Sequence, residues 1–249
     1  DRFRGRLMIP IRDARGRVIA FGGRILGDGE PKYLNSPDTP LFDKGRTLYN
    51  LDRAAPAARK AGRLFIVEGY MDVIALAQAG IAEAVAPLGT ALTEHQIELA
   101  WRQVPVPILA FDGDAAGQRA ALRAANRALP LLRPGHSLSF VTLPAGQDPD
   151  DIVRSGGAAA FDALAAQAMP LSKLLFRHEA AAYDVTLPDG RAALKDGLEK
   201  KAHEINDPNI SSEYKRWFID KFYGNFGWKK SNLTEIKHAS TEALKITSK

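Results

Sequence analysis

Hydrophobic and polar residues alternate in the first part of the chain in a way that is typical of strands. Phe3–Ile11 and Arg17–Ile25 both have alternating or continuous apolar positions, and residues 13–16 between them (Asp-Ala-Arg-Gly) are turn formers. This pattern predicts a β-hairpin. The following stretch over 27–40, rich in Gly, Pro, Asn and Asp, is predicted to be a loop, and a short helix is expected over Asn50–Lys60.

Strands and helices alternate in the next part of the chain. Four short apolar runs are predicted to be buried strands: Arg63–Val67, Ala84–Leu88, Pro107–Phe111 and Ser137–Leu143. The stretches between them have helical patterns: Tyr70–Gln78, a helix that Thr93 caps and that runs to Trp101, and Ala115–Leu132. Alternation at this spacing predicts a parallel sheet covered by helices. In such sheets, functional residues gather at the carboxyl ends of the strands.

The pattern changes again after about residue 150, where the strand signals stop. Four further helices are predicted: Ala158–Ala168, Pro170–Ala182, Arg191–Glu204 and Ser212–Phe222. The stretch from Trp228 onward is expected to be poorly ordered. These changes predict three domains, which are a basic β-rich lobe over 1–62, a parallel-sheet domain over 63–150 and a helical subdomain over 151–249.

The composition is that of an ordinary globular protein, since 45% of its 249 residues are hydrophobic and 25% are charged. No apolar run approaches the ~18 residues that a membrane-spanning helix requires, and the N-terminus has no signal-peptide pattern, so a cytoplasmic location is expected. Cysteine is absent, and the five histidines are scattered without an i,i+4 pair. These counts exclude disulfides and thiolate zinc sites and argue against a histidine metal site, which leaves oxygen ligands for any metal.

Charge is unevenly distributed along the chain. The overall net charge is +5, and the acidic and basic residues in the sequence give +6 for residues 1–62, −4 for residues 63–170 and +3 for residues 171–249. Basic flanks around an acidic middle favour a polyanion-binding surface beside a carboxylate site that holds cations. The same distribution fits two solvated basic faces equally well.

Acidic side chains follow three of the predicted strands. Glu68 follows the first strand of the alternating region, Asp112 and Asp114 follow the third, and Asp148, Asp150 and Asp151 follow the fourth. Because the carboxyl ends of parallel strands meet at one edge of a sheet, we expect these carboxylates to converge. Converging carboxylates repel one another unless cations lie among them, and magnesium, which prefers oxygen ligands, is the expected ion.

Each acidic cluster also has a structural interpretation. The Asp-Gly-Asp run fits a turn, Asp148 before a proline fits a helix N-cap, and Asp150 fits a favourable interaction with the helix dipole. Glu68 is the hardest of these residues to explain structurally, because a carboxylate at the end of an apolar strand is costly to bury without a partner.

The Asp-x-Asp pattern after a strand also fits a phosphatase of the haloacid-dehalogenase type. Asp112 would then be the nucleophile, and Arg133 or Arg154 would contact the phosphate. The absence of lysine over 61–172 weakens this interpretation without excluding it.

Glu68-Gly69 after one strand and Asp112-x-Asp114 after another resemble a Toprim domain, the metal-binding unit of primases, topoisomerases and some nucleases. Further motifs in the same order resemble the RNA polymerase core of bacterial DnaG-type DNA primases: Phe3–Pro10, Arg12–Arg24, Lys32–Pro37, Lys44–Arg46, Glu68–Val73, Phe111–Gly117 and Asp148–Asp150. The resemblance covers about residues 1–180. It implies an α/β fold, in which a Toprim-type parallel-sheet domain is flanked by a partial basic β-rich N-terminal lobe and a C-terminal helical bundle.

The resemblance also implies which residues form the site. Glu68, Asp112 and Asp114 match the catalytic and metal-binding carboxylates, Asp148 and Asp150 match further metal ligands, and Asp72 completes the acidic rim. Contacts with template and nucleotide are expected from Arg2, Arg4, Lys32, Tyr33, Asn35 and Lys44. The residues themselves support part of this set, because Arg2, Arg4 and Arg6 share strand parity and are predicted to project from one face, which could also be a plain exposed face. The expected ion is Mg²⁺, for which Mn²⁺ can substitute, and no zinc is expected in this fragment.

The implied activity is that of a nucleotidyltransferase, a DNA-directed RNA polymerase of the primase type. Its expected partners are a single-stranded DNA template, nucleoside triphosphates, the RNA primer and, through a domain absent here, the replicative helicase; a monomer without membrane contact is expected. The family's zinc-binding module is also absent, and family core sequence precedes Asp1, so the basic lobe is expected to be partial. Two alternatives stay open: another Toprim enzyme, such as a topoisomerase or nuclease, and a non-catalytic fragment that binds nucleotide or helicase.

Overall fold

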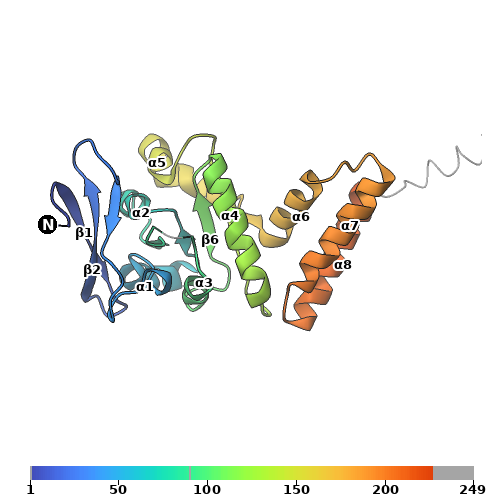
Figure 1. Cartoon of the computed structure of the whole chain (residues 1–249), viewed down its shortest axis with the longest axis horizontal. Coiled ribbons are helices and arrows are strands. Elements are labelled where there is room, and N and C mark those ends of the chain that lie inside the picture. Colours follow the sequence, from blue (N-terminus) through green and yellow to red (C-terminus); the bar gives the residue numbers. More distant parts are fainter. Residues whose placement is uncertain (1, 90, 227–249) are drawn as a thin grey trace, which may run out of the picture. The chain divides into compact units, whose positions relative to one another are not determined.

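The computed structural model describes residues 2–89 and 91–226 and divides the chain into two compact units, Asp1–Leu175 and Phe176–Lys249. Figure 1 traces the helices and strands along the chain. Both sheets belong to the first unit. The three-domain division expected from the sequence remains a prediction.

The first unit begins with a three-stranded antiparallel sheet, β1 (Arg6–Arg12), β2 (Val18–Ile25) and β3 (Tyr33–Asn35), in that order across the sheet. The predicted hairpin is confirmed, since β1 pairs with β2, and Asp13 Oδ1 accepts hydrogen bonds of 2.9 Å from two backbone amides in the turn. β3 lies within the stretch predicted to be a loop. It forms by pairing with β2 over residues 22–24, a contact between distant residues that the local pattern does not reveal.

The first strand begins later than predicted, at Arg6 instead of Phe3. The chain turns before it, with Gly5 in the left-handed region (φ 66°) and the Arg6 amide donating to the Phe3 carbonyl (3.2 Å). Arg2 and Arg4 therefore lie in a turn. The prediction that they share a strand face with Arg6 is wrong.

The second sheet of this unit has five strands, in the order β5 (Ala84–Val85), β4 (Phe65–Ile66), β6 (Ile108–Phe111), β7 (Ser139–Thr142) and β8 (Met169–Pro170). β4 pairs in parallel with β5 and β6, and β6 pairs in parallel with β7, so the predicted parallel sheet is confirmed. β8 adds an antiparallel edge beyond the point where strand signals were expected to stop. A strand of two residues is too short to show a periodicity, and its proline is tolerated at an edge.

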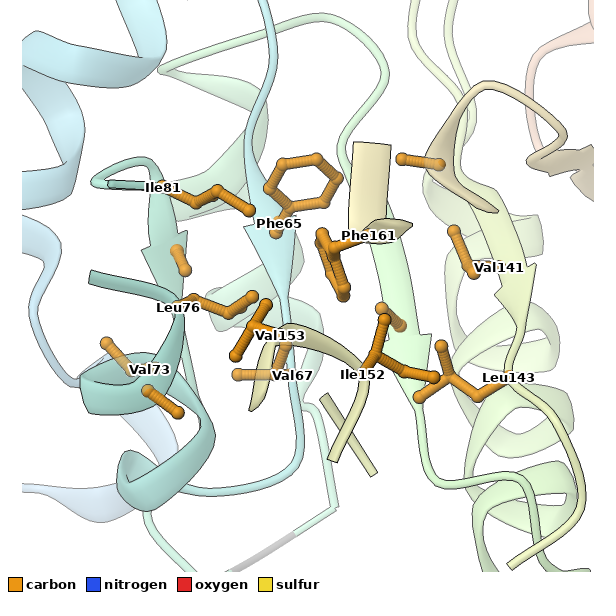
Figure 2. Close-up of a cluster of buried hydrophobic side chains, with 14 of the residues drawn as sticks. Phe65, Val67, Val73, Leu76, Ile81, Val141, Leu143, Ile152, Val153 and Phe161 are labelled. Atoms are coloured by element: carbon orange, nitrogen blue, oxygen red, sulfur yellow. The ribbon is translucent and has the colours of Figure 1, made fainter. Parts of the chain in front are cut away.

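Helices cover both faces of this sheet. They are α1 (Leu51–Ala61), α2 (Tyr70–Gln78), α3 (Glu94–Trp101), α4 (Ala115–Ala128) and α5 (Pro149–Ala165), with short 3₁₀ helices η1 (Lys44–Arg46) and η2 (Leu129–Leu131). α2 and α5 pack together over one face, around the buried side chains of Phe65, Val67 and Phe161 (Figure 2). Since side chains alternate along a strand, Leu64 and Ile66 point to the other face. There α4 packs on β6 and against α3.

The helix predicted over Ala158–Ala168 is the second half of a longer element. α5 starts at Pro149, and its backbone is non-helical at Gly157 (φ 66°, ψ −170°). This glycine interrupts the apolar periodicity, so the local pattern shows only the part of the helix after it.

A second apolar cluster joins the antiparallel sheet to the parallel-sheet layer. Ile9 and Ile11 of β1 are buried together with Phe42, Tyr70 and Leu88. Tyr70 is the first residue of α2, so this cluster fixes the antiparallel sheet next to the end of β4.

The C-terminal helices are α6 (Leu171–Ala181), α7 (Pro188–His203) and α8 (Pro208–Phe226). α7 and α8 pack together and bury side chains at helical spacing: Leu194, Leu198 and Ala202 of α7, and Phe218 and Phe222 of α8. The stretch from Trp228, expected to be poorly ordered, lies outside the described residues. Among the helices that the structure describes, none combines the length and apolar character needed to cross a bilayer.

Candidate active site

The carboxyl ends of β4 and β6 meet at the centre of the parallel sheet. The chain passes from β4 to β5 on one side and from β6 to β7 on the other, which makes this pair the switch point of the sheet. Glu68 follows β4 and Asp112 follows β6, and the backbone N–H of Asp112 donates to Glu68 Oε1 (3.1 Å). The structure therefore brings together two acidic residues that are 44 positions apart.

Two glycines allow the loop after β6 to approach its neighbours closely. A Cβ on Gly113 would lie 1.9 Å from the Pro144 carbonyl oxygen, and a Cβ on Gly117 would lie 2.2 Å from the Asp112 carbonyl oxygen. The Gly113 amide also donates a 3.0 Å hydrogen bond to the carbonyl of the residue before Asp148. The Asp-Gly-Asp-Ala-Ala-Gly run thus requires glycine at both positions to seat Asp112 beside the start of α5.

Two of the acidic residues cap the helices that follow the strands. Asp114 Oδ1 accepts hydrogen bonds from the amides of Ala116 (2.8 Å) and Gly117 (2.7 Å) at the start of α4. Asp148 Oδ1 accepts from the Asp151 amide (2.8 Å) at the start of α5, which is the N-cap role that the sequence suggested for it. Both caps use Oδ1, so Oδ2 of each side chain remains available to coordinate a cation.

Burial and mutual repulsion raise the pKa values of three carboxyl groups at this site, those of Asp72, Asp112 and Glu68. Burial is the main cause that raises the pKa of Asp72 to about 7 and that of Asp112 to about 6, and neighbouring negative charges add to both. Burial also raises the pKa of Glu68, against the hydrogen bond from the Asp112 amide, and the charge of Asp114 raises it further. We refer to Glu68, Asp72, Asp112, Asp114 and Asp148 as the carboxylate cluster.

A divalent cation would relieve this repulsion. Within residues 2–89 and 91–226, no three carboxylate or imidazole side chains are already grouped as a complete ligand set. Two features nevertheless suit a hard cation, because Asp112 Oδ1 is buried without a hydrogen-bond partner and the donors are carboxylate oxygens. Magnesium commonly takes only one or two carboxylates and completes its shell with water and phosphate oxygens. The residues fit such a partly hydrated ion.

The remaining predicted acidic residues differ in their surroundings. Asp72 is only 9% exposed, and its Oδ2 accepts a hydrogen bond from the Gly69 amide (3.0 Å). Asp150 forms an ion pair with Arg154 (2.6 Å), and its role as a metal ligand stays a prediction. Among the residues at the start of α5, Asp148 and Asp151 carry the charges that raise the pKa of Asp112.

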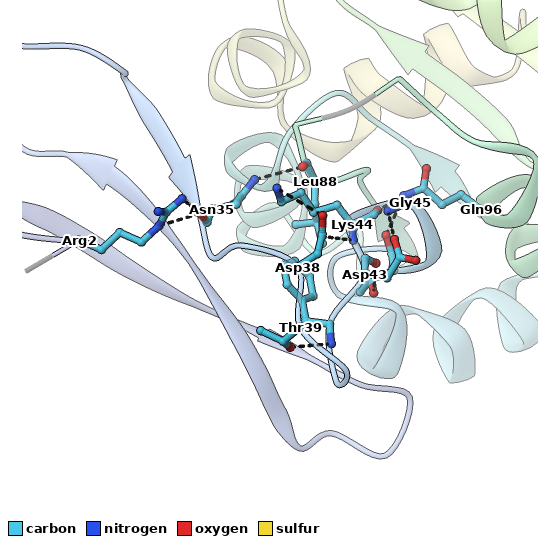
Figure 3. Close-up of polar contacts among 11 residues, drawn as sticks. Arg2, Asn35, Asp38, Thr39, Asp43, Lys44, Gly45, Leu88 and Gln96 are labelled. Carbon is cyan, nitrogen blue, oxygen red and sulfur yellow. Dashed lines mark hydrogen bonds and ion pairs between the residues drawn. The ribbon is translucent and has the colours of Figure 1, made fainter.

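The expected nucleic-acid contacts begin with Arg2 and Asn35, which hold the antiparallel sheet in place. The Arg2 guanidinium donates to the Asn35 carbonyl (3.0 and 3.3 Å), and the Asn35 amide donates to the Leu88 carbonyl (3.1 Å), as Figure 3 shows. These bonds connect the N-terminal turn to β3 and to the segment after β5. Arg4 is exposed in the same turn. Direct contact of these residues with template or nucleotide stays a prediction.

Tyr33 presents a partly exposed aromatic ring that packs against the start of α2. The side chain is 41% exposed and packs edge-to-face on Tyr70, with 5.5 Å between the ring centroids. The charged groups of Arg24 and Lys32 lie 5.6 and 5.8 Å from the Tyr33 ring centroid. A partly exposed ring with adjacent cations suits stacking on a base and contact with its phosphate. Tyr70 directly follows the Glu68-Gly69 pair, so the Tyr33 ring packs on the first residue of α2, two positions after Glu68.

Lys44 lies in a turn whose backbone carbonyls accept hydrogen bonds from a buried side chain. The side chain of Gln96 is fully buried, and its Nε2 donates to the carbonyls of Lys44 (2.9 Å) and Thr47 (2.8 Å) (Figure 3). The Lys44 ammonium lies 4.0 Å from Asp38 Oδ2, a long ion pair at a partly exposed site, which contributes little stability. We refer to Arg24, Lys32, Tyr33 and Lys44 as the basic surface.

Sequence reasoning missed Arg24, Tyr70 and Gln96 as contributors to this region, whereas it expected Asp151 among the converging carboxylates without giving it a role in the site. Arg24 is the cross-strand partner of Tyr33, which becomes visible only once β3 is known. Asp151 carried a local signal, since it stands three residues after the N-cap Asp148, where a capping box returns its side chain to the cap. A buried glutamine and a buried tyrosine carry no such signal in a single sequence.

A parallel sheet with Glu at the end of one central strand and Asp-x-Asp at the end of its neighbour defines the Toprim class of domains. The Toprim domain model matches residues 62–142, and the model of the DNA primase catalytic core, N-terminal domain, matches residues 1–55. The DNA primase of Escherichia coli (strain K12) is 54% identical over 194 residues, which are 78% of this chain and 33% of that protein. The chain therefore spans about a third of the length of the curated primases it matches.

Solved structures agree with this relationship. The E. coli primase catalytic core superposes with a TM-score of 0.83 at 48% identity, over 89% of this chain and 71% of that one. A DnaG primase catalytic domain bound to ssDNA gives a TM-score of 0.81 at 47% identity, over 88% and 71% of the two chains. This chain belongs to the family of DnaG-type DNA primase catalytic cores. None of these relatives favours the topoisomerase, nuclease, phosphatase or non-catalytic alternatives.

Proposed function

We propose that this chain is the RNA-polymerising core of a bacterial DNA primase, which makes short RNA primers from nucleoside triphosphates on a single-stranded DNA template. The contact between the Asp112 amide and the Glu68 carboxylate (3.1 Å) at the switch point of the sheet carries this proposal. The contact brings together two of the expected carboxylates, and the packing of Tyr33 on Tyr70, which directly follows Glu68-Gly69, supports a nucleic-acid surface nearby. The activity of the whole protein is part of the proposal, because the chain spans only a third of its curated relatives.

The two surfaces divide the work of such a reaction. A DnaG catalytic domain has been solved with ssDNA, and the basic surface of this chain suits a nucleic-acid strand, because it combines cations with a partly exposed aromatic ring. We assign base stacking to Tyr33 and phosphate contacts to Lys32 and Lys44. Arg2, with Asn35, acts in this proposal by fixing the position of β3.

The carboxylate cluster would hold the catalytic ions. Glu68, Asp112 and Asp114 would bind Mg²⁺, or Mn²⁺ in its place, with contributions from Asp148 and Asp150. When bound, the ions polarise the reacting phosphate and neutralise the leaving pyrophosphate. The protein contributes preorganisation, because the Asp112 amide fixes the Glu68 carboxylate and the helix caps fix Asp114 and Asp148 before substrate arrives.

The overall reaction joins the primer 3′-hydroxyl to the α-phosphate of the incoming nucleotide, and pyrophosphate leaves. Nucleoside triphosphates and the growing RNA primer are therefore the expected ligands in addition to the template. We also expect the chain to act as a monomer at the replication fork and to reach the replicative helicase through a domain outside this sequence.

The test is the synthesis of labelled oligoribonucleotides by the purified chain on single-stranded DNA with magnesium or manganese. Asp112→Asn and Asp114→Asn should reduce synthesis by at least about a thousandfold, because each removes a charge that the ions need. Asp114→Asn is the sharper variant, since asparagine can still cap α4 and leaves the fold intact.

Asp28→Asn is the matched control, because Asp28 is an exposed aspartate in the segment after β2. It should synthesise primers at the rate of the unsubstituted chain. Synthesis at that rate by either cluster variant, or plasmid nicking without any RNA product, would contradict the proposal.

A further inference from the structure

Helix α4 carries three arginines at four-residue intervals, Arg119, Arg123 and Arg127, which places them on one face of the helix. Arg127 shows where this face points. Its Nη1 donates to the carbonyls of Leu92 (2.6 Å) and Ala91 (3.4 Å), which belong to the segment between β5 and α3. The face thus runs beside this segment, on the β4 side of β6.

The other two arginines differ from Arg127 in being exposed residues, whereas Arg127 is partly buried. Neither makes a hydrogen bond or an ion pair within residues 2–89 and 91–226. By contrast, Arg63 and Arg154 in the same unit are paired with carboxylates at 2.7 and 2.6 Å. Two unpaired cations on one face are available to an external anion.

These two arginines lie on the helix that begins at the carboxylate cluster. The helix begins at the N-cap Asp114, so Arg119 lies roughly 7.5 Å and Arg123 roughly 13.5 Å further along the helix axis. The face therefore starts at the carboxylate cluster and leads away from it.

We propose that Arg119 and Arg123 form a phosphate-binding strip next to the carboxylate cluster. Carboxylates repel phosphate groups, so a phosphate ligand that reaches the cluster needs cations beside it, and residues 61–172 contain no lysine that could serve. Arginine binds phosphate through paired N–H groups, which suits this use. The spacing of the two residues, ~6 Å along the axis, is comparable to the spacing of successive phosphates on an extended nucleic-acid strand. The inference rests on the proposed function, because it concerns the substrates of the same site.

The ligand is either the backbone of the bound strand or the triphosphate of the nucleotide, and two binding measurements distinguish them. One uses fluorescence anisotropy of labelled single-stranded DNA and of an RNA–DNA hybrid over a range of salt concentrations. The other uses a fluorescent ATP analogue in magnesium buffer. The variants are Arg119→Ala, Arg123→Ala, their double variant and the double Arg→Lys variant, which keeps both charges. Far-UV circular dichroism checks that the helix is retained.

If the strip binds the backbone, the double Ala variant should lose about tenfold or more in nucleic-acid affinity at low salt, and the slope of log K against log salt should fall by about 2. If it binds the triphosphate, affinity for the ATP analogue should fall instead. The double Arg→Lys variant should regain most of the salt-dependent affinity that the double Ala variant loses. Arg102→Ala is the matched control, because Arg102 is exposed and follows α3, before β6 rather than after it.

Unchanged affinity of the double Ala variant for both ligands, or an equal loss in Arg102→Ala, would overturn the inference. In that case the unsubstituted chain would still make RNA, and the proposed function would stand. A chain that binds neither ligand and makes no RNA would overturn both.

Discussion

The carboxylate cluster and the basic surface both have a residue beside the start of α2, but they are built from different kinds of structure. The cluster stands on the ends of neighbouring parallel strands and is fixed by backbone contacts, such as the approach of Gly113 to the Pro144 carbonyl. The basic surface stands on a three-residue strand and a turn, and it is held by side-chain hydrogen bonds such as that from Asn35 to Leu88.

We therefore expect the carboxylate cluster to be rigid and the basic surface to be adaptable. Chemistry at a phosphate needs carboxylates held to within a fraction of an ångström, and only backbone packing supplies that precision at an acceptable cost in entropy. A surface that lets successive bases and phosphates pass needs exposed cations and rings that can adjust. Substitutions at the backbone positions that hold the cluster should therefore change stability and activity together, whereas substitutions on the basic surface should change binding alone.

The largest expected effect comes from the backbone of the cluster. In Gly113→Ala, the added Cβ would lie 1.9 Å from a backbone oxygen, so the loop after β6 has to move. We expect a loss of more than about 3 kcal/mol in the free energy of unfolding, together with loss of primer synthesis. Urea denaturation followed by circular dichroism measures the first effect.

Gly27→Ala is the control, since a Cβ at that position meets no atom within 4 Å. It should leave the free energy of unfolding nearly unchanged. Equal stability of the two variants would show that the loop tolerates movement and that the cluster is less rigid than this comparison holds.

The next effect is a pH dependence that only the cluster should show. Burial raises the pKa of Asp72 to about 7, above its value in the unfolded chain. A carboxyl group shifted in this direction stabilises the fold fully below about pH 4, and its contribution is lost as the pH rises through 7. In EDTA, Asp72→Asn should therefore be more stable relative to the unsubstituted chain at pH 8 than at pH 4, by about 3 kcal/mol.

The measurement is urea denaturation of both proteins at pH 4 and pH 8, so that the direct cost of the substitution cancels. Asp52→Asn, which changes a carboxyl group on α1, is measured in the same way as the control. A difference of the opposite sign for Asp72→Asn would mean that folding lowers the pKa of this carboxyl group instead of raising it.

Magnesium binding should relieve the repulsion among the carboxylates of the cluster. At pH 8, above the raised pKa values of Asp72 and Asp112, magnesium at a hundredfold excess over its dissociation constant should add about 2.7 kcal/mol of stability. At pH 5 the stabilisation should be much smaller, because Asp112, whose pKa is raised to about 6, binds a proton instead. Thermal unfolding in magnesium chloride, compared with sodium chloride of equal ionic strength, measures this. Asp112→Asn should lose the response, and a response that persists in that variant would place the ion elsewhere.

Most of the parallel-sheet layer was predictable because its signals are local. The bounds of α2, Tyr70–Gln78, are those predicted, and α3 follows the predicted cap Thr93. β3 and β8 were not predictable, since two or three residues become a strand only through pairing with partners far away in the sequence. The strand parity assigned to Arg2 and Arg4 failed for a related reason, because the turn at Gly5 ends the extended segment.

The site shows the same division. The meeting of Glu68 and Asp112 follows from the positions of β4 and β6, so the sequence pattern was enough to anticipate it. Which oxygens would bind an ion was not predictable, because Asp114 and Asp148 also cap helices and Asp150 pairs with Arg154. The environment of Tyr33 required the cross-strand position of Arg24, which depends on a strand that the pattern did not show.

The smallest expected effect tests the basic surface through Tyr33. If its ring stacks on a base, Tyr33→Ala should weaken binding of single-stranded DNA by about 1–2 kcal/mol, roughly tenfold, because the stacking surface is lost. Tyr33→Phe keeps the ring and should bind within about twofold of the unsubstituted chain. Since the side chain is 41% exposed, neither substitution should change the free energy of unfolding by more than about 1 kcal/mol. A Tyr33→Ala variant that loses stability in proportion to binding would mean that the ring supports Tyr70 and the start of α2, and that the two regions are a single rigid structure.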